Sequence, residues 1–220
     1  MHDRQLLIDT DIFILLSGSG LFERVAAIFN LNRASLRRLP AVSRQLQKGN
    51  KFKKNYPDII RKLGIEAAST IHPIETQISD ASIANLLAAV DDIDPGEALL
   101  LGLLVENKSW LLTTGDKRFL RALARSPSLY SVRNAVAGRI VCLETVIELL
   151  VGIEGIKPVA VAFTNVRDCN QTLSVIFSSG ENTGEEHCRA GLESKIRDLE
   201  SDIGPNLLYR PVKRCEVDCI

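Results

Sequence analysis

Three apolar segments of this chain each meet a carboxylate where the backbone should be buried. Leu6-Leu7-Ile8 runs into Asp9, residues 111–114 lead to Asp116, and Glu97 stands in the first turn of a strongly apolar helical segment. A buried carboxylate costs free energy unless hydrogen bonds, a basic partner or a metal ion offset the burial. Because these segments contain no basic residue, we expect a divalent cation beside the three carboxylates.

Strand-like segments alternate with helical patterns along the first two thirds of the chain. Residues 5–9, 67–74, 110–114 and 139–143 have the composition of strands, and helical spacing separates them. Such alternation predicts an α/β fold with a parallel central sheet and helices on both faces, in three layers. Ligands of these sheets bind at the carboxyl ends of the strands, where the two aspartates are expected to lie.

The rest of the chain has the organisation of one domain followed by an extension. Residues 33–63 look helical and polar, and Ser79 or Asp80 can cap a further helix. A turn-rich break occurs near residue 155, and residues 185–203 show helical spacing of leucine and isoleucine. We therefore predict a domain over residues 1–155 and a C-terminal helical extension over residues 156–220.

Bulk composition indicates an ordinary soluble chain. Apolar residues make up 45% and charged residues 25% of the 220 residues, and the formal net charge is zero. No apolar run approaches the ~18 residues that a bilayer-spanning helix needs. The first residues lack the pattern of a signal peptide. We expect a cytoplasmic protein without a membrane segment.

The five cysteines do not indicate a disulfide framework, because their number is odd and they are widely spread. Three residues separate Cys215 from Cys219, and a zinc site that joins them with His187 and Cys188 is an alternative with irregular spacing. Unconnected free thiols are the favoured interpretation.

Basic residues are concentrated between Arg33 and Lys62, where Asp58 is the sole acid. Such a surface favours the phosphate backbone of a nucleic acid. Phe52 and Tyr56 lie within the stretch and would stack on unpaired bases. The plainer alternative is a solvated helix pair, or a surface covered by the acid-rich helix near residues 181–202. The candidate nucleic-acid contacts are Arg37, Arg38, Arg44, Lys48, Lys51, Lys53, Lys54, Lys117 and Arg118.

Three motifs together resemble the PIN-domain nucleases, a family that includes the ribonuclease toxins of toxin–antitoxin pairs. The motifs are LLIDTDIFILL, DPGEALLLGLL and WLLTTGDKRFLRAL, and the resemblance covers residues 5–150. It implies that Asp9, Glu97 and Asp116 bind Mg²⁺ or Mn²⁺, and that Thr114 orients Asp9. The implied activity is metal-dependent endoribonuclease cleavage of RNA. The implied partners are RNA, an antitoxin-like protein and a second copy of the chain.

The chain departs from the family pattern at two places. Family members usually carry an acid on an early helix, where this chain has Ser43, Gln45 and Gln47. Many members also place an acid two residues after the aspartate of the third motif, where this chain has Arg118. Asp11 would partly substitute for the missing acids.

Two alternatives to the nuclease follow from the same residues. The missing acids favour a catalytically weak or inactive module that binds nucleic acid or assembles with partners. The segment Leu7-Ile8-Asp9-Thr10-Asp11 also resembles the nucleophile loop of haloacid-dehalogenase phosphatases. Those enzymes need a later lysine and a downstream acidic pair, for which Gly115-Asp116 alone is thin support, and they give no reason for the Gly-Glu-Ala helix. Taken singly, Asp9, Glu97 and Asp116 are each typical of helix caps.

Overall fold

Four short parallel strands form one central sheet in the computed structural model, which describes residues 4–211. The strands are β1 (Leu6–Ile8), β2 (Leu36–Arg38), β3 (Leu111–Thr114) and β4 (Ile140–Cys142). Their order is β2-β1-β3-β4, and Leu6 of β1 lies opposite both Leu36 and Leu111. Every residue of β1, β3 and β4 is buried, as expected for parallel strands covered on both faces.

Helices make up most of the remaining structure, and short 3₁₀ turns connect several of them. The helices are α1 (Thr10–Ser19), α2 (Phe22–Ile28), α3 (Val42–Lys48), α4 (Asn50–Asn55), α5 (Asp58–Thr70), α6 (Ala81–Ala88), α7 (Pro95–Glu106), α8 (Lys117–Arg125), α9 (Tyr130–Val136), α10 (Leu143–Glu154), α11 (Ile156–Phe163), α12 (Gln171–Ile176) and α13 (Glu185–Ile203). The 3₁₀ turns are η1 (Arg33–Ser35), η2 (Pro127–Leu129), η3 (Thr164–Cys169) and η4 (Gly180–Asn182).

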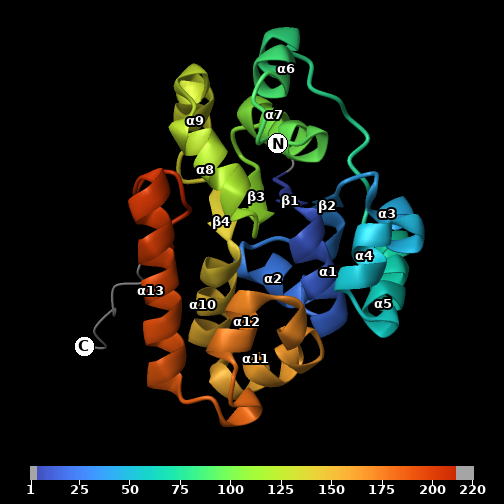
Figure 1. The fold of residues 1–220 in the computed structure, drawn as a ribbon, viewed down its shortest axis with the longest axis vertical. Coiled ribbons are helices and arrows are strands. Elements are labelled where there is room, and N and C mark those ends of the chain that lie inside the picture. Colours follow the sequence, from blue (N-terminus) through green and yellow to red (C-terminus); the bar gives the residue numbers. More distant parts are fainter. Residues whose placement is uncertain (1–3, 212–220) are drawn as a thin grey trace.

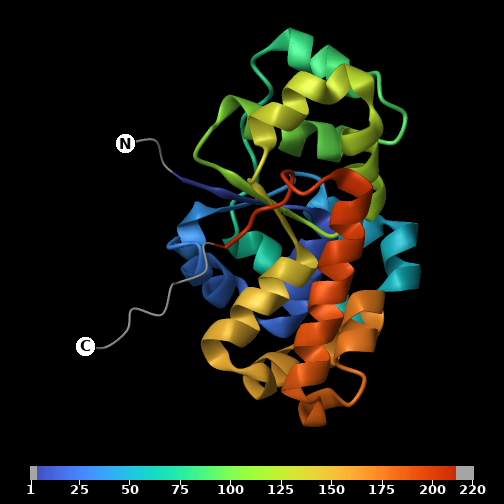
Figure 2. The ribbon, with the colours of Figure 1, turned by 90° about the vertical axis from the view of Figure 1, so that its left-hand side faces the viewer.

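Helices lie on both sides of the sheet (Figures 1 and 2). In Figure 2 the sheet crosses the middle of the molecule, with α6, α7 and α9 above it and α1, α2 and α10 below it. Contacts of α7 and α1 with β3, and of α10 with β4, agree with this arrangement. The predicted α/β architecture with a parallel, helix-covered sheet is therefore confirmed.

The predicted second strand is wrong. Residues 67–74 were expected to be extended, but α5 continues to Thr70, and only Pro73 forms an isolated bridge, with Arg38. The second strand is instead β2, inside the stretch expected to be helical. Its three residues, Leu-Arg-Arg, have no marked strand propensity, so pairing with the exposed edge of β1 decides their conformation.

The C-terminal part of the described chain packs directly against the sheet-bearing part. Helix α11 and turn η3 contact α1, while α13 contacts α8 and α10. Leu208 bridges to Ile140 of β4. The helix predicted at residues 185–203 is confirmed as α13, but it does not cover the basic stretch, which runs from η1 through β2, α3 and α4 into α5 (Figure 1).

Two further expectations concern the termini and the membrane. Cys215 and Cys219 lie outside the described residues, while Cys188 is buried and unbridged. Every helix within residues 4–211 is too short or too polar to traverse a lipid bilayer.

Candidate functional site

Residues from the carboxyl ends of β1 and β3 line one cavity of ≈ 550 Å³. Asp9 follows β1, Asp116 follows β3, and Glu97 reaches the cavity from the first turn of α7. Asp11, the additional candidate, lines the same cavity. The structure thus brings to one place carboxylates that are up to 107 positions apart in the chain, and we call this space the carboxylate cavity.

Asp9 is buried and receives hydrogen bonds from neutral donors. Its Oδ1 accepts from the amide of Thr10 at 2.6 Å, and its Oδ2 accepts from Oγ1 of Thr114 at 2.8 Å. The structure therefore contains the hydrogen bond through which Thr114 was expected to orient Asp9. Burial raises the pKa of Asp9 to about 7, and the bond from Thr114 only partly opposes this rise.

Glu97 is also buried, with 5% of its surface exposed, and it closes a capping box at the start of α7. Its Oε2 accepts from the amide of Asp94 at 2.8 Å, and its own amide donates to Oδ1 of Asp94 at 2.8 Å. Burial raises the pKa of Glu97 to about 8, and the charges of Asp94, Asp116 and Asp9 act in the same direction. Asp116 and Asp9 are therefore close enough to Glu97 for their negative charges to repel its carboxylate.

Asp116 caps α8 with a single carboxylate oxygen. Its Oδ1 accepts from the amides of Arg118 and Phe119 at 2.8 and 3.0 Å. Its Oδ2 lies 4.0 Å from the guanidinium of Arg118. The capping interpretation is therefore correct for this residue, and the position of its side chain on the carboxylate cavity is compatible with a second role.

The oxygen donors of the cavity fit a hard divalent cation. Asp9 and Glu97 are buried without an ion-pair partner among the described residues. Gln45 of α3 also lines the cavity, and its buried Oε1 has no hydrogen-bond partner there. Within residues 4–211, however, no three acidic, histidine or cysteine side chains converge as a ready-made ligand group. A cation would therefore complete its coordination with water and substrate oxygens, as Mg²⁺ usually does.

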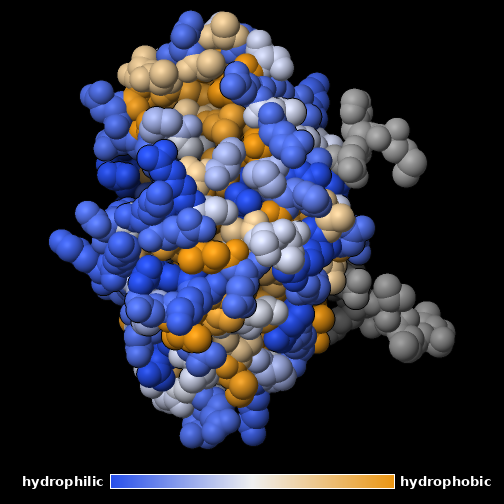
Figure 3. Space-filling view, turned by 90° about the vertical axis from the view of Figure 1, so that its right-hand side faces the viewer, coloured by the Kyte–Doolittle hydropathy of each residue, from blue (hydrophilic) through white to orange (hydrophobic). Residues whose placement is uncertain are grey.

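Two basic side chains line the carboxylate cavity from different elements. Lys51 belongs to α4 and Arg118 to α8, and both residues are exposed. Both were predicted as nucleic-acid contacts. Arg44, Lys48, Lys53 and Lys54 are exposed on α3 and α4 as well. In Figure 3, which faces the side of α3, α4 and α5, hydrophilic residues dominate the surface between scattered apolar patches.

Several predicted nucleic-acid contacts are buried or lie away from the carboxylates. Arg38 is buried, and its guanidinium donates to the carbonyls of Ala68 and Ile71, so it secures α5 against β2. Phe52 and Tyr56 are buried and stack on each other, so Tyr56 is not free to stack on a base. Arg37 is half-buried and lines a separate pocket beside His72 and Trp110, away from the carboxylates.

The hydroxyl of Tyr56 has a different role, because it donates to Oδ1 of Asp11 at 3.1 Å. Burial and the neighbouring carboxylate of Asp11 raise the pKa of Tyr56, which stays protonated and keeps this bond. Asp11, which lines the cavity, is therefore oriented by the residue that directly follows α4, the helix that carries Lys51.

Lys117, another predicted phosphate contact, is engaged elsewhere. Its Nζ lies 2.9 Å from Oε1 of Glu144, a buried carboxylate that also accepts from the hydroxyl of Thr172 at 3.0 Å. Burial alone would raise the pKa of Glu144, but Lys117 and the hydrogen bonds hold it below its usual value. Glu144 follows β4 as Asp116 follows β3, a signal that the sequence analysis did not use.

A scan against protein-family models gave no match, and searches of curated proteins and of solved structures found no significant similarity.

Proposed function

We propose that the chain is a metal-dependent endoribonuclease of the PIN type, with the carboxylate cavity as its active site. The observation that carries this proposal is the pair of buried carboxylates, Asp9 and Glu97, which share one cavity with Asp116 and have no basic partner in the described chain. Buried charges are otherwise paired or bound to metals. A cation at this position would explain why burial of both side chains is tolerated.

The chemistry follows from the residues that line the cavity. Asp9, Glu97 and Asp116, with the amide oxygen of Gln45, would hold Mg²⁺ or Mn²⁺. The bound ion would activate water and neutralise charge on the phosphate. Thr114 keeps one oxygen of Asp9 in a fixed orientation through its hydroxyl.

Lys51 and Arg118 would position the substrate. They line the cavity from two different helices. A phosphodiester bound in the cavity would therefore contact the ammonium group of Lys51 and the guanidinium group of Arg118 near the carboxylates. Guanidinium and ammonium groups bind phosphate oxygens through charge-assisted hydrogen bonds. These contacts read no base sequence, so cleavage specificity would arise elsewhere on the surface.

A non-catalytic nucleic-acid-binding module is the second candidate. Gln45 and Arg118 occupy positions where the resembled family carries acids, and Asp116 and Glu97 both have capping roles. In this case the basic surface would bind RNA without cleaving it.

A cleavage assay separates the two functions. Labelled RNA is incubated with Mn²⁺ or Mg²⁺ and wild-type protein, Asp9→Asn or Asp116→Asn. We expect metal-dependent cleavage that falls by about 100-fold or more in both variants, since each loses a ligand charge. RNA binding without cleavage in all three proteins would support the second candidate.

Asp80→Asn is the matched control. Asp80 caps α6 by accepting from Ser82 and Ile83, as Asp116 caps α8, but it does not line the carboxylate cavity. Its replacement should leave cleavage unchanged. An equal loss in Asp80→Asn and Asp116→Asn would show that capping, not metal binding, accounts for the effect.

A further inference from the structure

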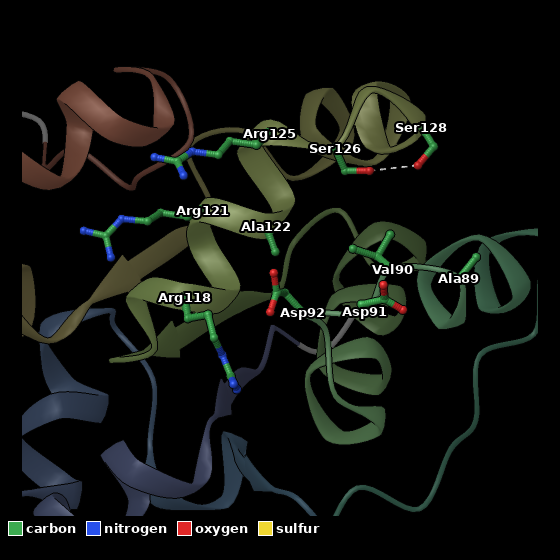
Figure 4. Close-up of a pocket in the computed structure, with 10 residues that line it drawn as sticks. All are labelled: Ala89, Val90, Asp91, Asp92, Arg118, Arg121, Ala122, Arg125, Ser126 and Ser128. Carbon is green, nitrogen blue, oxygen red and sulfur yellow. Dashed lines mark hydrogen bonds between the residues drawn. The ribbon is translucent and has the colours of Figure 1, made fainter.

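A second groove, of ≈ 550 Å³, runs along α8 and shares Arg118 with the carboxylate cavity (Figure 4). Arg121 and Arg125 line it from the same helix. We call it the arginine groove. Because Arg118 lines both spaces, an extended ligand that leaves the carboxylate cavity past Arg118 would enter the arginine groove.

The spacing of the three arginines places them on one face of α8. They are three and four residues apart, the separations that bring helical side chains above one another. With about 1.5 Å of rise per residue, the row is roughly 10 Å long. A stacked nucleic-acid strand carries one phosphate per about 3.4 Å, so the row matches roughly three consecutive phosphates.

The guanidinium groups are accessible to a ligand. Arg118 and Arg125 are exposed, and 42% of the Arg121 side chain is exposed. Arg121 pairs with Asp202 of α13 at 2.8 Å, but an ion pair between two partly exposed side chains contributes little to stability. A phosphate can therefore replace Asp202 as the partner of Arg121.

The residues that line the groove carry both signs of charge. Figure 4 shows Arg121 and Arg125 leaving α8 toward α13, whereas the side chain of Arg118 points in another direction, and Asp91 and Asp92 lie on the far side of α8 from Arg121 and Arg125. Carboxylates accept hydrogen bonds from the exocyclic amino groups of bases. The arginines thus suit phosphates and the aspartates suit base edges, whereas an acidic polypeptide would be repelled by the aspartates.

We propose that the arginine groove binds the single-stranded RNA that flanks the scissile phosphodiester, with its backbone along Arg118, Arg121 and Arg125. This inference rests on the proposed nuclease function and extends it by assigning a second, backbone-binding groove on α8, outside the carboxylate cavity. Duplex RNA and short fragments would leave most of the row unused.

The test compares Arg121→Gln/Arg125→Gln with wild-type protein. Fluorescent oligocytidines of about four and about twelve nucleotides, whose bases carry an exocyclic amino group, are titrated at several salt concentrations, with Ca²⁺ present to limit cleavage. We expect wild-type protein to bind the longer strand at least tenfold more tightly, and the double variant to lose this advantage. The slope of log affinity against log salt should fall by about 1.4, because each phosphate contact on a single strand contributes about 0.7.

Arg189→Gln/Arg197→Gln is the matched control, since both arginines are exposed on α13 and pair with glutamates of that helix. This control should keep the wild-type slope and length advantage. An unchanged slope in the Arg121→Gln/Arg125→Gln variant overturns the proposed groove, and so does tighter binding of polyglutamate than of RNA. Neither result bears on the nuclease, which is judged separately by cleavage in wild-type protein and its loss in Asp116→Asn.

Discussion

The hydroxyl of Thr114 donates a 2.8 Å hydrogen bond to Oδ2 of Asp9, across 105 positions of sequence. Oγ1 of Thr114 also accepts a hydrogen bond from the amide of Asp116 at 3.1 Å. Thr114, the last residue of β3, therefore orients both the carboxylate of Asp9, which follows β1, and the backbone of Asp116, which follows β3. Such supporting contacts tune a metal site without touching the ion.

Replacing Thr114 by valine should weaken metal binding and cleavage. The change removes the donor to Asp9 while it keeps the shape of the side chain, and loss of comparable contacts costs about 10–100-fold. Mn²⁺ affinity by calorimetry and RNA cleavage should fall together, and Thr114→Ser should retain most of both. Thr113→Val is the control, because Oγ1 of Thr113 is buried without a hydrogen-bond partner among the described residues. An equal loss in both valine variants would contradict the orienting role.

The pH dependence of stability should reveal the buried carboxyl of Asp9. In metal-free protein its pKa is about 7 against 3.8 ordinarily, so the folded state keeps a proton that the unfolded chain releases. Stability should therefore fall as the pH rises from about 4 to about 7. The side chain of Asp9→Asn does not titrate, so its burial carries no cost of ionisation. Above pH ~7 in EDTA this variant should be more stable than wild type by on the order of 2 kcal/mol.

Chemical denaturation across this pH range measures the difference. Asp80→Asn should show the opposite sign, because hydrogen bonds from Ser82 lower the pKa of Asp80, and the variant loses stability that wild type has above pH ~4. Saturating Mn²⁺ should abolish the advantage of Asp9→Asn by stabilising wild type selectively. Wild type that is at least as stable as Asp9→Asn at pH 8 in EDTA would refute the raised pKa.

Sequence reasoning was most successful where the apolar pattern was long and local. It predicted β1, β3 and β4, and it located α13 at Glu185–Ile203. It also placed Asp9 and Asp116 at one edge of the sheet, since parallel strands all end on the same side. These predictions succeeded because they needed only the apolar pattern of each segment and the rule that parallel strands end on the same side of a sheet.

The sequence-based predictions failed where tertiary contacts determine whether a side chain is buried or exposed. Arg38 belongs to a cluster of basic residues, yet its position on the edge strand buries it against the end of α5, where free carbonyls accept its guanidinium. Phe52 and Tyr56 have a spacing compatible with base stacking, but the same spacing makes a helix face that packs inward. No pattern in the sequence distinguishes these alternatives without knowledge of the neighbouring elements.

Gln45→Glu should strengthen metal binding. Gln45 lines the carboxylate cavity with a buried oxygen that lacks a hydrogen-bond partner within residues 4–211, so a glutamate there adds a charge to the donor set. Ligand charge tunes the affinity of such sites, and we expect about tenfold tighter Mn²⁺ binding by calorimetry. Gln47→Glu makes the same charge change on the exposed side of α3 and should alter affinity little. Equal affinities for both variants would place the cation away from Gln45.

The buried pair of Lys117 and Glu144 predicts an asymmetric double-mutant cycle. Lys117→Met leaves Glu144 buried without its cation, and breaking such pairs typically costs about 3–5 kcal/mol, less here because Lys117 is partly exposed. Glu144→Gln keeps an acceptor for Thr172 and leaves a lysine that can reach water, so it should cost less. The double variant should be more stable than Lys117→Met alone. Urea denaturation of the four proteins measures the coupling, and additive effects would show that the pair is not formed.

Gly18→Ala should loosen the C-terminal region from α1. An added Cβ at Gly18 would overlap Cγ1 of Val166 in η3, and the branched valine has little freedom to yield. Overpacking of this kind costs about 1–3 kcal/mol, more than the ~1 kcal/mol that alanine gains over glycine in a helix.

Gly152→Ala provides the opposite case, because no atom of the described residues lies within 4 Å of a Cβ added there. It is also helical, so the same substitution should stabilise the protein by about 0.5–1 kcal/mol. Thermal unfolding compares the two variants, and hydrogen exchange of α11 and α12 reports whether Gly18→Ala acts locally. If both variants gain stability, α1 and η3 are not in close contact.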